Sequence, residues 1–174
     1  MQQRGLIHYY YGGGKGKTTA ALGLALRYSG QSGKTVIVQF LKNSHCGELD
    51  ALQKLDNVTV LRGKSGDGFT FSMTQQQLEE TRRIHQKNLQ TAMELVKDGG
   101  LLILDEATDA VRSNTLDEQL LKDAILKKGD KTEIAVTGHT PLEWLIEAAD
   151  YVTEMKKHKH PFDKGITARK GIEF

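Results

Sequence analysis

A glycine-rich stretch near the start of the chain, "YGGGKGKTT", constrains the possible fold more than any other feature of the sequence. The apolar residues 6–11 before it predict a short buried strand, and the Ala- and Leu-rich residues 17–28 after it predict a helix. Glycines tolerate backbone conformations in which several N–H groups point inward around phosphate oxygens. A strand, a glycine loop and a helix in this order are typical of a site that binds nucleotide phosphates.

The side chains beside these glycines suit a nucleoside triphosphate bound with Mg²⁺. Lys17 supplies a mobile cation for phosphate, Thr18 offers a hydroxyl to the metal, and the helix adds its positive end. The general pattern G-x-x-x-x-G-K-[ST] fails at its first position, Tyr11. A flexible turn without a ligand is the alternative, which the flanking strand and helix disfavour. The predicted nucleotide-binding residues are Gly12, Gly13, Gly14, Lys15, Gly16, Lys17, Thr18 and Thr19.

The rest of the chain alternates predicted strands with predicted helices. Apolar, β-branched runs predict strands at residues 34–40, 57–61, 101–106, 132–138 and 151–155, the last at an edge of the sheet. Three helices carry start signals: Thr74 with Gln77 at residues 74–97, Thr115 with Glu118 in the next helix, and Thr140, Pro141 and Glu143 at residues 140–149.

This alternation predicts one α/β domain over residues 1–174, with a mostly parallel sheet, helices on both faces and a C-terminal edge strand. In such sheets, ligands bind beyond the carboxyl ends of the strands. The glycines, the pair Asp105–Glu106 and the pair Gly138–His139 all follow predicted strands, so we expect them to converge. Asp105 or Glu106 is then predicted to hold Mg²⁺ with Thr18, directly or through water, and the sequence leaves open which carboxylate makes the contact.

Two further groups of residues have more than one interpretation. Phe69 and Phe71 lie in the polar, glycine-flanked stretch "GDGFTFS", where they either anchor a loop to the core or present an apolar surface to a large flat ligand. His139 either reaches phosphate or simply leads into the next helix. His158 and His160 lie in a charged, proline-containing segment, which favours a solvated surface over a metal site.

Composition excludes several classes of function. The formal charge of +2 gives no general attraction to nucleic acid or to an anionic membrane. No apolar run approaches the roughly 18 residues that span a bilayer. The single cysteine, Cys46, cannot form an internal disulfide, and a cytoplasmic location is therefore predicted.

Seven segments together resemble the corrinoid adenosyltransferases of the CobA/BtuR (CobO) type, in the right order and over nearly the whole chain. They are "GGGKGKTTAALGLALR", "VIVQFLK", "GFTF", "LILDE", "VTGH", "EAADYVTEM" and "KHPFDKGITARKGIEF". The resemblance implies a RecA-like P-loop fold, a homodimer and a flavoprotein reductase as partner. It also implies that Co(I) of a corrinoid attacks the ribose C5′ of ATP and that triphosphate leaves, in adenosylcobalamin biosynthesis or salvage.

The resemblance assigns roles to particular residues. Lys17 and Thr18 are expected to be catalytic, with Thr18, Glu106 and Asp105 around Mg²⁺, and Arg27 matches an arginine that aids nucleotide binding. Phe69 and Phe71 match paired aromatic positions that crowd the lower face of the corrinoid and displace its axial ligand, which eases reduction of Co(II). His139 is expected to contact the corrinoid or ATP.

Three departures from the family pattern accompany these roles. Relatives often carry Trp at the position of Phe71 and Arg at that of His139. They also usually carry an N-terminal extension over the corrinoid site, whereas only residues 1–11 precede the glycines here.

Two other functional classes remain open from the residues alone. One is a RecA-like ATPase that acts as a motor or switch and releases ADP and phosphate. The other is a protein that binds ATP or corrinoid without turnover. The identity of the products separates all three functions.

Overall fold

A six-stranded sheet forms the centre of the computed structural model, which describes residues 4–43, 47–66 and 70–173. Its order is β3-β2-β4-β5-β1-β6, and all five recorded strand pairs are parallel. The strands are β1 (Ile7–Tyr11), β2 (Thr35–Gln39), β3 (Val58–Arg62), β4 (Gly100–Asp105), β5 (Thr132–Gly138) and β6 (Tyr151–Glu154). Strand β5 lies between β1, which leads into the glycines, and β4, which leads into the carboxylates.

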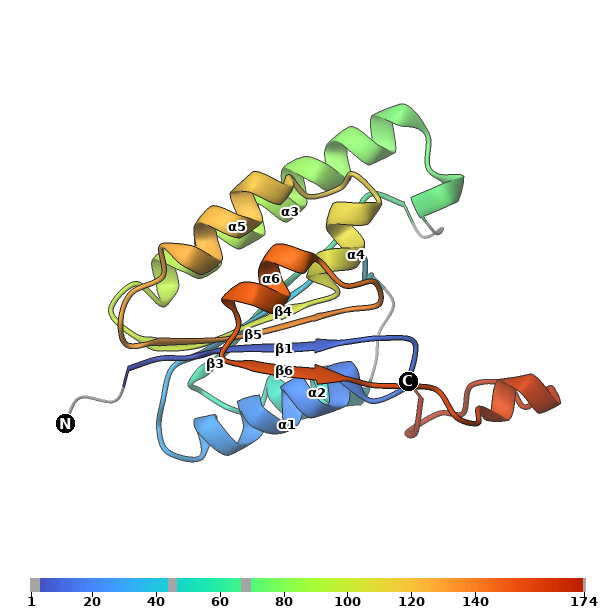
Figure 1. The fold of residues 1–174 in the computed structure, drawn as a ribbon, viewed down its shortest axis with the longest axis horizontal. Coiled ribbons are helices and arrows are strands. Elements are labelled where there is room, and N and C mark those ends of the chain that lie inside the picture. The colour runs from blue at the N-terminus through green and yellow to red at the C-terminus, as the bar shows by residue number, and fades with distance from the viewer. Residues whose placement is uncertain (1–3, 44–46, 67–69, 174) are drawn as a thin grey trace.

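Helices cover both faces of this sheet, as Figure 1 shows. One face carries α3 (Gln75–Leu95), α4 (Ala107–Arg112), α5 (Glu118–Leu126) and α6 (Glu143–Ala148). The other face carries α1 (Lys17–Ser29) and α2 (Gly47–Leu52). Two short 3₁₀ helices complete the described elements, η1 (Thr70–Ser72) and η2 (Pro161–Lys164). The predicted RecA-like P-loop α/β fold class is confirmed, including the parallel sheet and its C-terminal edge strand.

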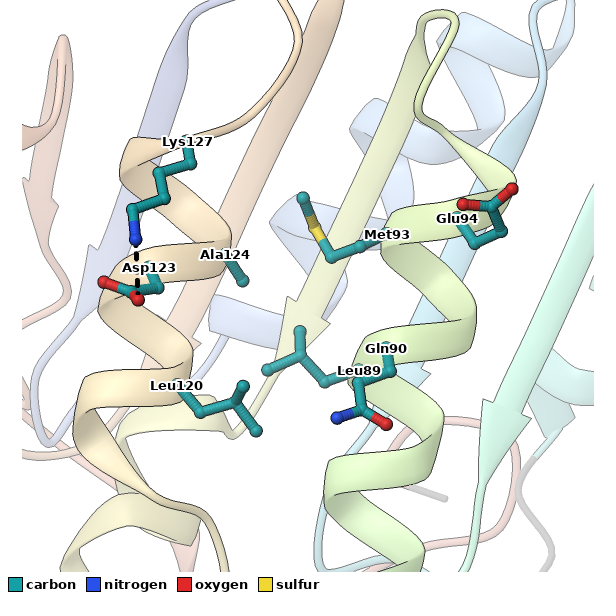
Figure 2. Close-up of a pocket in the computed structure, with 8 residues that line it drawn as sticks. All are labelled: Leu89, Gln90, Met93, Glu94, Leu120, Asp123, Ala124 and Lys127. Carbon is teal, nitrogen blue, oxygen red and sulfur yellow. Dashed lines mark hydrogen bonds and ion pairs between the residues drawn. The ribbon is translucent and has the colours of Figure 1, made fainter.

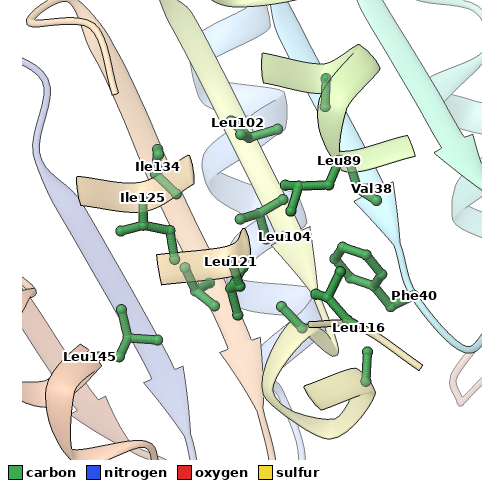
Figure 3. Packing of buried hydrophobic residues seen from close by; sticks show 14 of the residues in the cluster. Val38, Phe40, Leu89, Leu102, Leu104, Leu116, Leu121, Ile125, Ile134 and Leu145 are labelled. Atoms are coloured by element: carbon green, nitrogen blue, oxygen red, sulfur yellow. The ribbon is translucent and has the colours of Figure 1, made fainter. Parts of the chain in front are cut away.

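The central strands are buried on both faces because each face has its own helical layer. Every residue of β2 and β4 is buried, whereas all four residues of the edge strand β6 are exposed. Leu102 and Leu104 of β4 pack toward the α3–α5 layer, and Figure 3 draws them in one cluster with Leu89 of α3 and Leu121 of α5. Leu101 and Ile103, the alternate residues of β4, pack instead with the small residues of α1.

Helix starts were predicted with mixed success. The capping box of α3 is confirmed, since the Gln77 N–H donates to Thr74 Oγ1 and the Gln77 side chain accepts the Thr74 N–H. The prediction for α5 was wrong, because the N-cap is Asp117, two residues after Thr115: Asp117 accepts the Leu120 N–H at 2.7 Å, and the helix begins at Glu118.

The predicted start of the last helix was also wrong. Leu142 is the N-cap of α6, without a side-chain cap. The residues before it are already bound elsewhere: the Tyr9 and Thr108 hydroxyls donate to Thr140 O at 3.4 and 3.0 Å. These bonds hold residue 140 against β1 and α4, so the helix can start only beyond it. The six-residue helices α2 and α4 were not predicted.

The chain leaves the sheet after β6 as a C-terminal tail, residues 155–173, which contains η2. Figure 1 shows this tail on the side of the carboxyl ends of the strands. Among the helices of the described residues, none combines the length and the apolar character that crossing a bilayer requires.

Two leucines of α5 test the packing of the larger core. Leu121 is fully buried and Leu126 is 49% exposed on the same helix. We expect Leu121→Ala to lower the free energy of unfolding by about 2–5 kcal/mol, because it removes buried methyl groups and leaves a cavity. Leu126→Ala should change it by less than about 0.5 kcal/mol. Urea unfolding followed by circular dichroism measures both, and equal losses would contradict the described packing.

Candidate functional site

A cleft of ≈ 760 Å³ lies beyond the carboxyl ends of the strands. It brings together the glycine loop (residues 12–17), the start of α1, the ends of β4 and β5, the helix α2 and the C-terminal tail. The polar residues that line it are Lys15, Lys17, Thr18, Thr19, Lys42, Glu48, Glu106, Asp109, Thr137, His139 and Glu173. The three segments that the sequence analysis expected to converge therefore meet at one site.

The glycine loop is shaped by the chain that follows β6. The N–H of Gly14 donates to Met155 O at 2.6 Å, and the N–H of Gly12 donates to His139 O at 3.1 Å. A Cβ atom added at Gly12 or Gly14 would lie 2.7 or 2.5 Å from Met155 O. These two glycines thus allow a close approach of two backbones, and their amides bond to the protein rather than pointing to a phosphate site. Gly16, Lys17 and Thr18 line the cleft instead.

Lys17 braces the same loop with its side chain. Its ammonium donates to Gly12 O at 2.7 Å and to Gly14 O at 2.8 Å. Because Lys17 also lines the cleft, its positive charge lies at the wall of the cleft.

Asp105 is the buried centre of the polar network. Its Oδ1 accepts hydrogen bonds from the hydroxyls of Thr18 and Thr137, both at 2.8 Å, and its Oδ2 accepts from Lys42 at 2.7 Å. Glu106 follows in the left-handed conformation, with φ of 61°, and its N–H donates to Thr137 Oγ1. Burial raises the pKa of the Glu106 carboxyl, and the nearby Lys42 opposes that change.

The oxygens of this network suit Mg²⁺. Thr18 Oγ1, Asp105 and Glu106 all lie within 3.4 Å of one ammonium, that of Lys42. A hydroxyl and two carboxylates that already surround one cation form the hard donor set that Mg²⁺ prefers. The residues predicted to hold the metal therefore fit it by their chemistry.

Sequence reasoning missed the role of Lys42, although the segment "VIVQFLK" contains it. Lys42 follows β2 at the same sheet edge as Asp105, so the convergence argument could have included it. Two hydrogen bonds hold the backbone just before Lys42: the Phe40 N–H donates to Asp105 O, and the Leu41 N–H donates to His85 Nε2 at 3.3 Å. Leu41 has a φ of 61°, a left-handed conformation that a leucine in the sequence does not predict.

His139 and Arg27 occupy different positions relative to the cleft. His139 lines it, and its N–H donates to both carboxylate oxygens of Asp109 at 2.9 and 3.1 Å. Burial raises the pKa of Asp109, and this hydrogen bond opposes the rise. Arg27 is exposed in the last turn of α1 and is absent from the described residues that line the cleft. The structure does not bring it to the site.

A second groove, of ≈ 360 Å³, runs between α3 and α5, on the face of the sheet that these two helices cover. Figure 2 shows Leu89, Met93 and Leu120 facing it, with the Lys127–Asp123 ion pair beside it. None of the residues predicted to be functional lines this groove within the described chain. The cleft is therefore the candidate site.

Comparison with known proteins decides the family. The model of the family "ATP:corrinoid adenosyltransferase BtuR/CobO/CobP" matches residues 3–174. The chain belongs to this family. It is 34% identical to a corrinoid adenosyltransferase of Sinorhizobium sp, over 99% of this chain and 81% of that protein. It is 33% identical to one of Escherichia coli K12, over 100% of this chain and 88% of that protein.

In this adenosyltransferase the C-terminal tail forms part of the cleft. Gly171, Ile172 and Glu173 line it, and Glu173 accepts a hydrogen bond from Lys15 at 2.9 Å. Arg169 and Lys15 together lower the pKa of the Glu173 carboxyl to about 2. The ending of the sequence carried part of the family resemblance, but its contact with the glycine loop could not be inferred from residue spacing.

Phe71, one of the two predicted aromatic residues of the adenosyltransferase, is not among the described residues that line the cleft. Phe69 lies outside the described residues. Phe71 belongs to η1 and is 87% exposed. Figure 1 shows η1, in green, beyond the carboxyl ends of the strands, on the same side as the tail. Phe71 is therefore an exposed residue at the end of the molecule where the strands of the sheet end.

The buried His85 makes the fold of the adenosyltransferase sensitive to acid. Burial lowers the pKa of His85 to about 4, from about 6.5 in an unfolded chain. The unfolded state therefore binds the proton first as the pH falls, and the folded state loses stability between pH 6.5 and 4, by up to about 3 kcal/mol.

Urea unfolding at several pH values tests this effect. We expect His85→Gln to reduce the slope of stability against pH in this window, because the titrating group is gone. His158→Gln, a change at an exposed histidine of the tail, should keep the slope of the parent protein. An unchanged slope in His85→Gln would assign the acid sensitivity to other groups.

Proposed function

We propose that this protein transfers the 5′-deoxyadenosyl group of ATP to Co(I) of a corrinoid and releases triphosphate. Family membership over residues 3–174 is the observation that carries the proposal. The cleft supports it, because loop lysines and a carboxylate pair lie together at the carboxyl ends of the strands. Cobalt provides both electrons of the new Co–C5′ bond and rises formally from Co(I) to Co(III). The C5′–O bond breaks, and its electron pair leaves with the triphosphate.

The leaving group explains why the cleft is rich in cations. Triphosphate departs with about four negative charges, and preorganised positive groups lower the energy of that charge as it develops. Lys15 and Lys17 line the cleft, and the N-terminal end of α1 adds its partial positive charge. Thr18, Asp105 and Glu106 would hold Mg²⁺, which when bound neutralises part of the polyphosphate charge. A base that activates water is not required, since the nucleophile is the metal of the corrinoid.

Apolar residues of the cleft support a place for the nucleoside. Leu22 and Leu26 of α1 face the cleft together with Ala51, Leu52 and Leu55. An apolar wall next to a few charged groups is typical of sites that bind adenosine and similar ligands. This wall would hold the nucleoside while the triphosphate lies against the glycine loop, so that C5′ stays in a fixed position for in-line attack.

The corrinoid would lie on the side of η1 and meet the exposed ring of Phe71. In this proposal the ring crowds the lower axial position of cobalt, which favours a four-coordinate Co(II) that is easier to reduce. We further propose a homodimer, a flavoprotein reductase as the electron donor and a cytoplasmic location.

Product analysis of Lys17→Ala tests the proposed reaction. We expect the parent protein to give an organocobalt product and triphosphate from ATP, Mg²⁺ and Co(I) cobalamin. Lys17→Ala should lower the rate by on the order of 100-fold or more, because it removes a preorganised cation. Lys87→Ala, at an exposed lysine of α3, should keep the parent rate. Detection of only ADP and phosphate, without organocobalt, would exclude the proposal and favour an ATPase.

Phe71→Ala tests the role of the exposed ring. We expect this variant to lose rate when the reaction starts from Co(II) and a reductant, because the axial ligand stays bound. It should react normally when Co(I) is supplied, since the reduction step is then bypassed. Leu126→Ala, at an exposed leucine of α5, serves as the control for removal of apolar surface. Full activity of Phe71→Ala from Co(II) would show that the ring does not act on the cobalt.

A further inference from the structure

Lys42 contacts every residue that is expected to bind Mg²⁺. Its ammonium lies 2.7 Å from Asp105 Oδ2, 3.3 Å from Glu106 Oε1 and 3.4 Å from Thr18 Oγ1. Its side chain is 23% exposed and lines the same cleft as Lys15 and Lys17. A lysine among three predicted metal ligands needs an explanation, because its ammonium competes with a divalent cation for these oxygens.

The position of Lys42 is built into the fold. Burial disfavours its charge, but Asp105 and Glu106 outweigh that effect and raise the pKa of the ammonium. The bonds of Phe40 to Asp105 O and of Leu41 to His85 fix the backbone just before it. The side chain beyond that backbone is a flexible chain of four methylene groups, so the ammonium can move while the backbone stays.

We propose that Lys42 is an exchangeable counter-cation: it neutralises the Asp105–Glu106 pair, gives these oxygens up to a divalent cation, and then binds the polyphosphate. This inference rests on the proposed function, because it names the group that couples metal binding to stabilisation of the leaving triphosphate. No covalent bond changes in the exchange; the two ion pairs of Lys42 with Asp105 and Glu106 are replaced by metal contacts and by an ion pair with the polyphosphate.

Charge balance explains why the exchange would favour the reaction. With Lys42 in place, the two carboxylates and one ammonium carry a net charge of −1. With Mg²⁺ in its place, the same carboxylates and the metal are neutral, and the charge of Lys42 is released beside the phosphates. Mg²⁺ also needs oxygen ligands at about 2.0–2.1 Å in a near-octahedral arrangement, which leaves no room for an ammonium among them. The cleft therefore gains positive charge only when the metal is bound.

A static ion pair is the competing interpretation. In that case Lys42 only offsets the buried charge of Asp105, and its removal would lower stability without an effect that depends on the metal. The two interpretations differ in what happens to Lys42 when a metal binds: an exchangeable ammonium leaves the carboxylates, whereas a static one stays on them.

Mn²⁺ binding to the nucleotide-free protein is the first test, with free Mn²⁺ measured by its electron paramagnetic resonance signal. We expect Lys42→Met to bind Mn²⁺ on the order of tenfold more tightly than the parent, because two cations that compete for one site weaken each other reciprocally. Lys42→Arg, which keeps the charge, and Lys87→Met, outside the cleft, should bind Mn²⁺ as the parent does. Unchanged or weaker binding by Lys42→Met would overturn the proposal.

Binding of inorganic tripolyphosphate, measured by calorimetry with and without Mg²⁺, is the second test. With Mg²⁺, we expect Lys42→Met to bind tripolyphosphate on the order of tenfold more weakly than the parent, since the released ammonium is missing. Without Mg²⁺ the loss should be clearly smaller, since Lys42 then stays on the carboxylates and acts on the polyphosphate only by offsetting their charge. A loss of the same size under both conditions would contradict the exchange.

Lys42→Met leaves the buried Asp105 with one partner fewer, and this variant can fail to fold. A measurement on the parent protein does not depend on the folding of that variant. The ε-methylene NMR signal of Lys42, assigned from its absence in Lys42→Arg, should shift when Mg²⁺ is added. A signal that stays in place would overturn the proposal. These tests need no corrinoid, so a failure of adenosylation would refute the proposed function and leave the counter-cation result standing.

Discussion

The buried carboxylate of Asp105 is the interaction on which the rest of the site depends. It has no solvent exposure and accepts hydrogen bonds from residues that follow β1 and β2 and from a residue at the end of β5. A buried carboxylate without partners is strongly unfavourable, so the segments that supply these partners come together as the chain folds around it. One side chain thereby sets the relative positions of the glycine loop, the lysine that follows β2 and the β5 end.

The glycine loop illustrates how packing and ligand binding place different demands on neighbouring residues. Gly12 and Gly14 are small because the backbone of Met155 passes close to them. Lys15, Gly16 and Thr18 of the same stretch line the cleft. A glycine loop that looks uniform in the sequence therefore divides into residues that contact the chain beyond β6 and residues that line the cleft.

Much of this arrangement could be predicted from the sequence, for identifiable reasons. The strands, the α/β class and the meeting of Thr18 with Asp105 follow from apolar periodicity and from the rule that parallel strands end at one edge. The role of Lys42 was missed because the direction in which its side chain leaves the backbone depends on the left-handed conformation of Leu41. A leucine in a sequence does not indicate that conformation. Glu173 was missed because its partner Lys15 is 158 residues away, beyond the reach of any local pattern. At the start of α5, both Thr115 and Asp117 can cap a helix, and in the fold the hydroxyl of Thr115 instead donates a hydrogen bond to Ala110 O.

The contacts that close the cleft join residues separated by 63, 87 and 158 positions in the chain. No short fragment of the protein contains both sides of any of these bonds. The cleft therefore forms only in the complete fold. Local unfolding of one of these segments would separate the residues that line it. A molecule bound there would restrain segments from almost the whole length of the chain, so its binding energy would oppose unfolding of the entire domain.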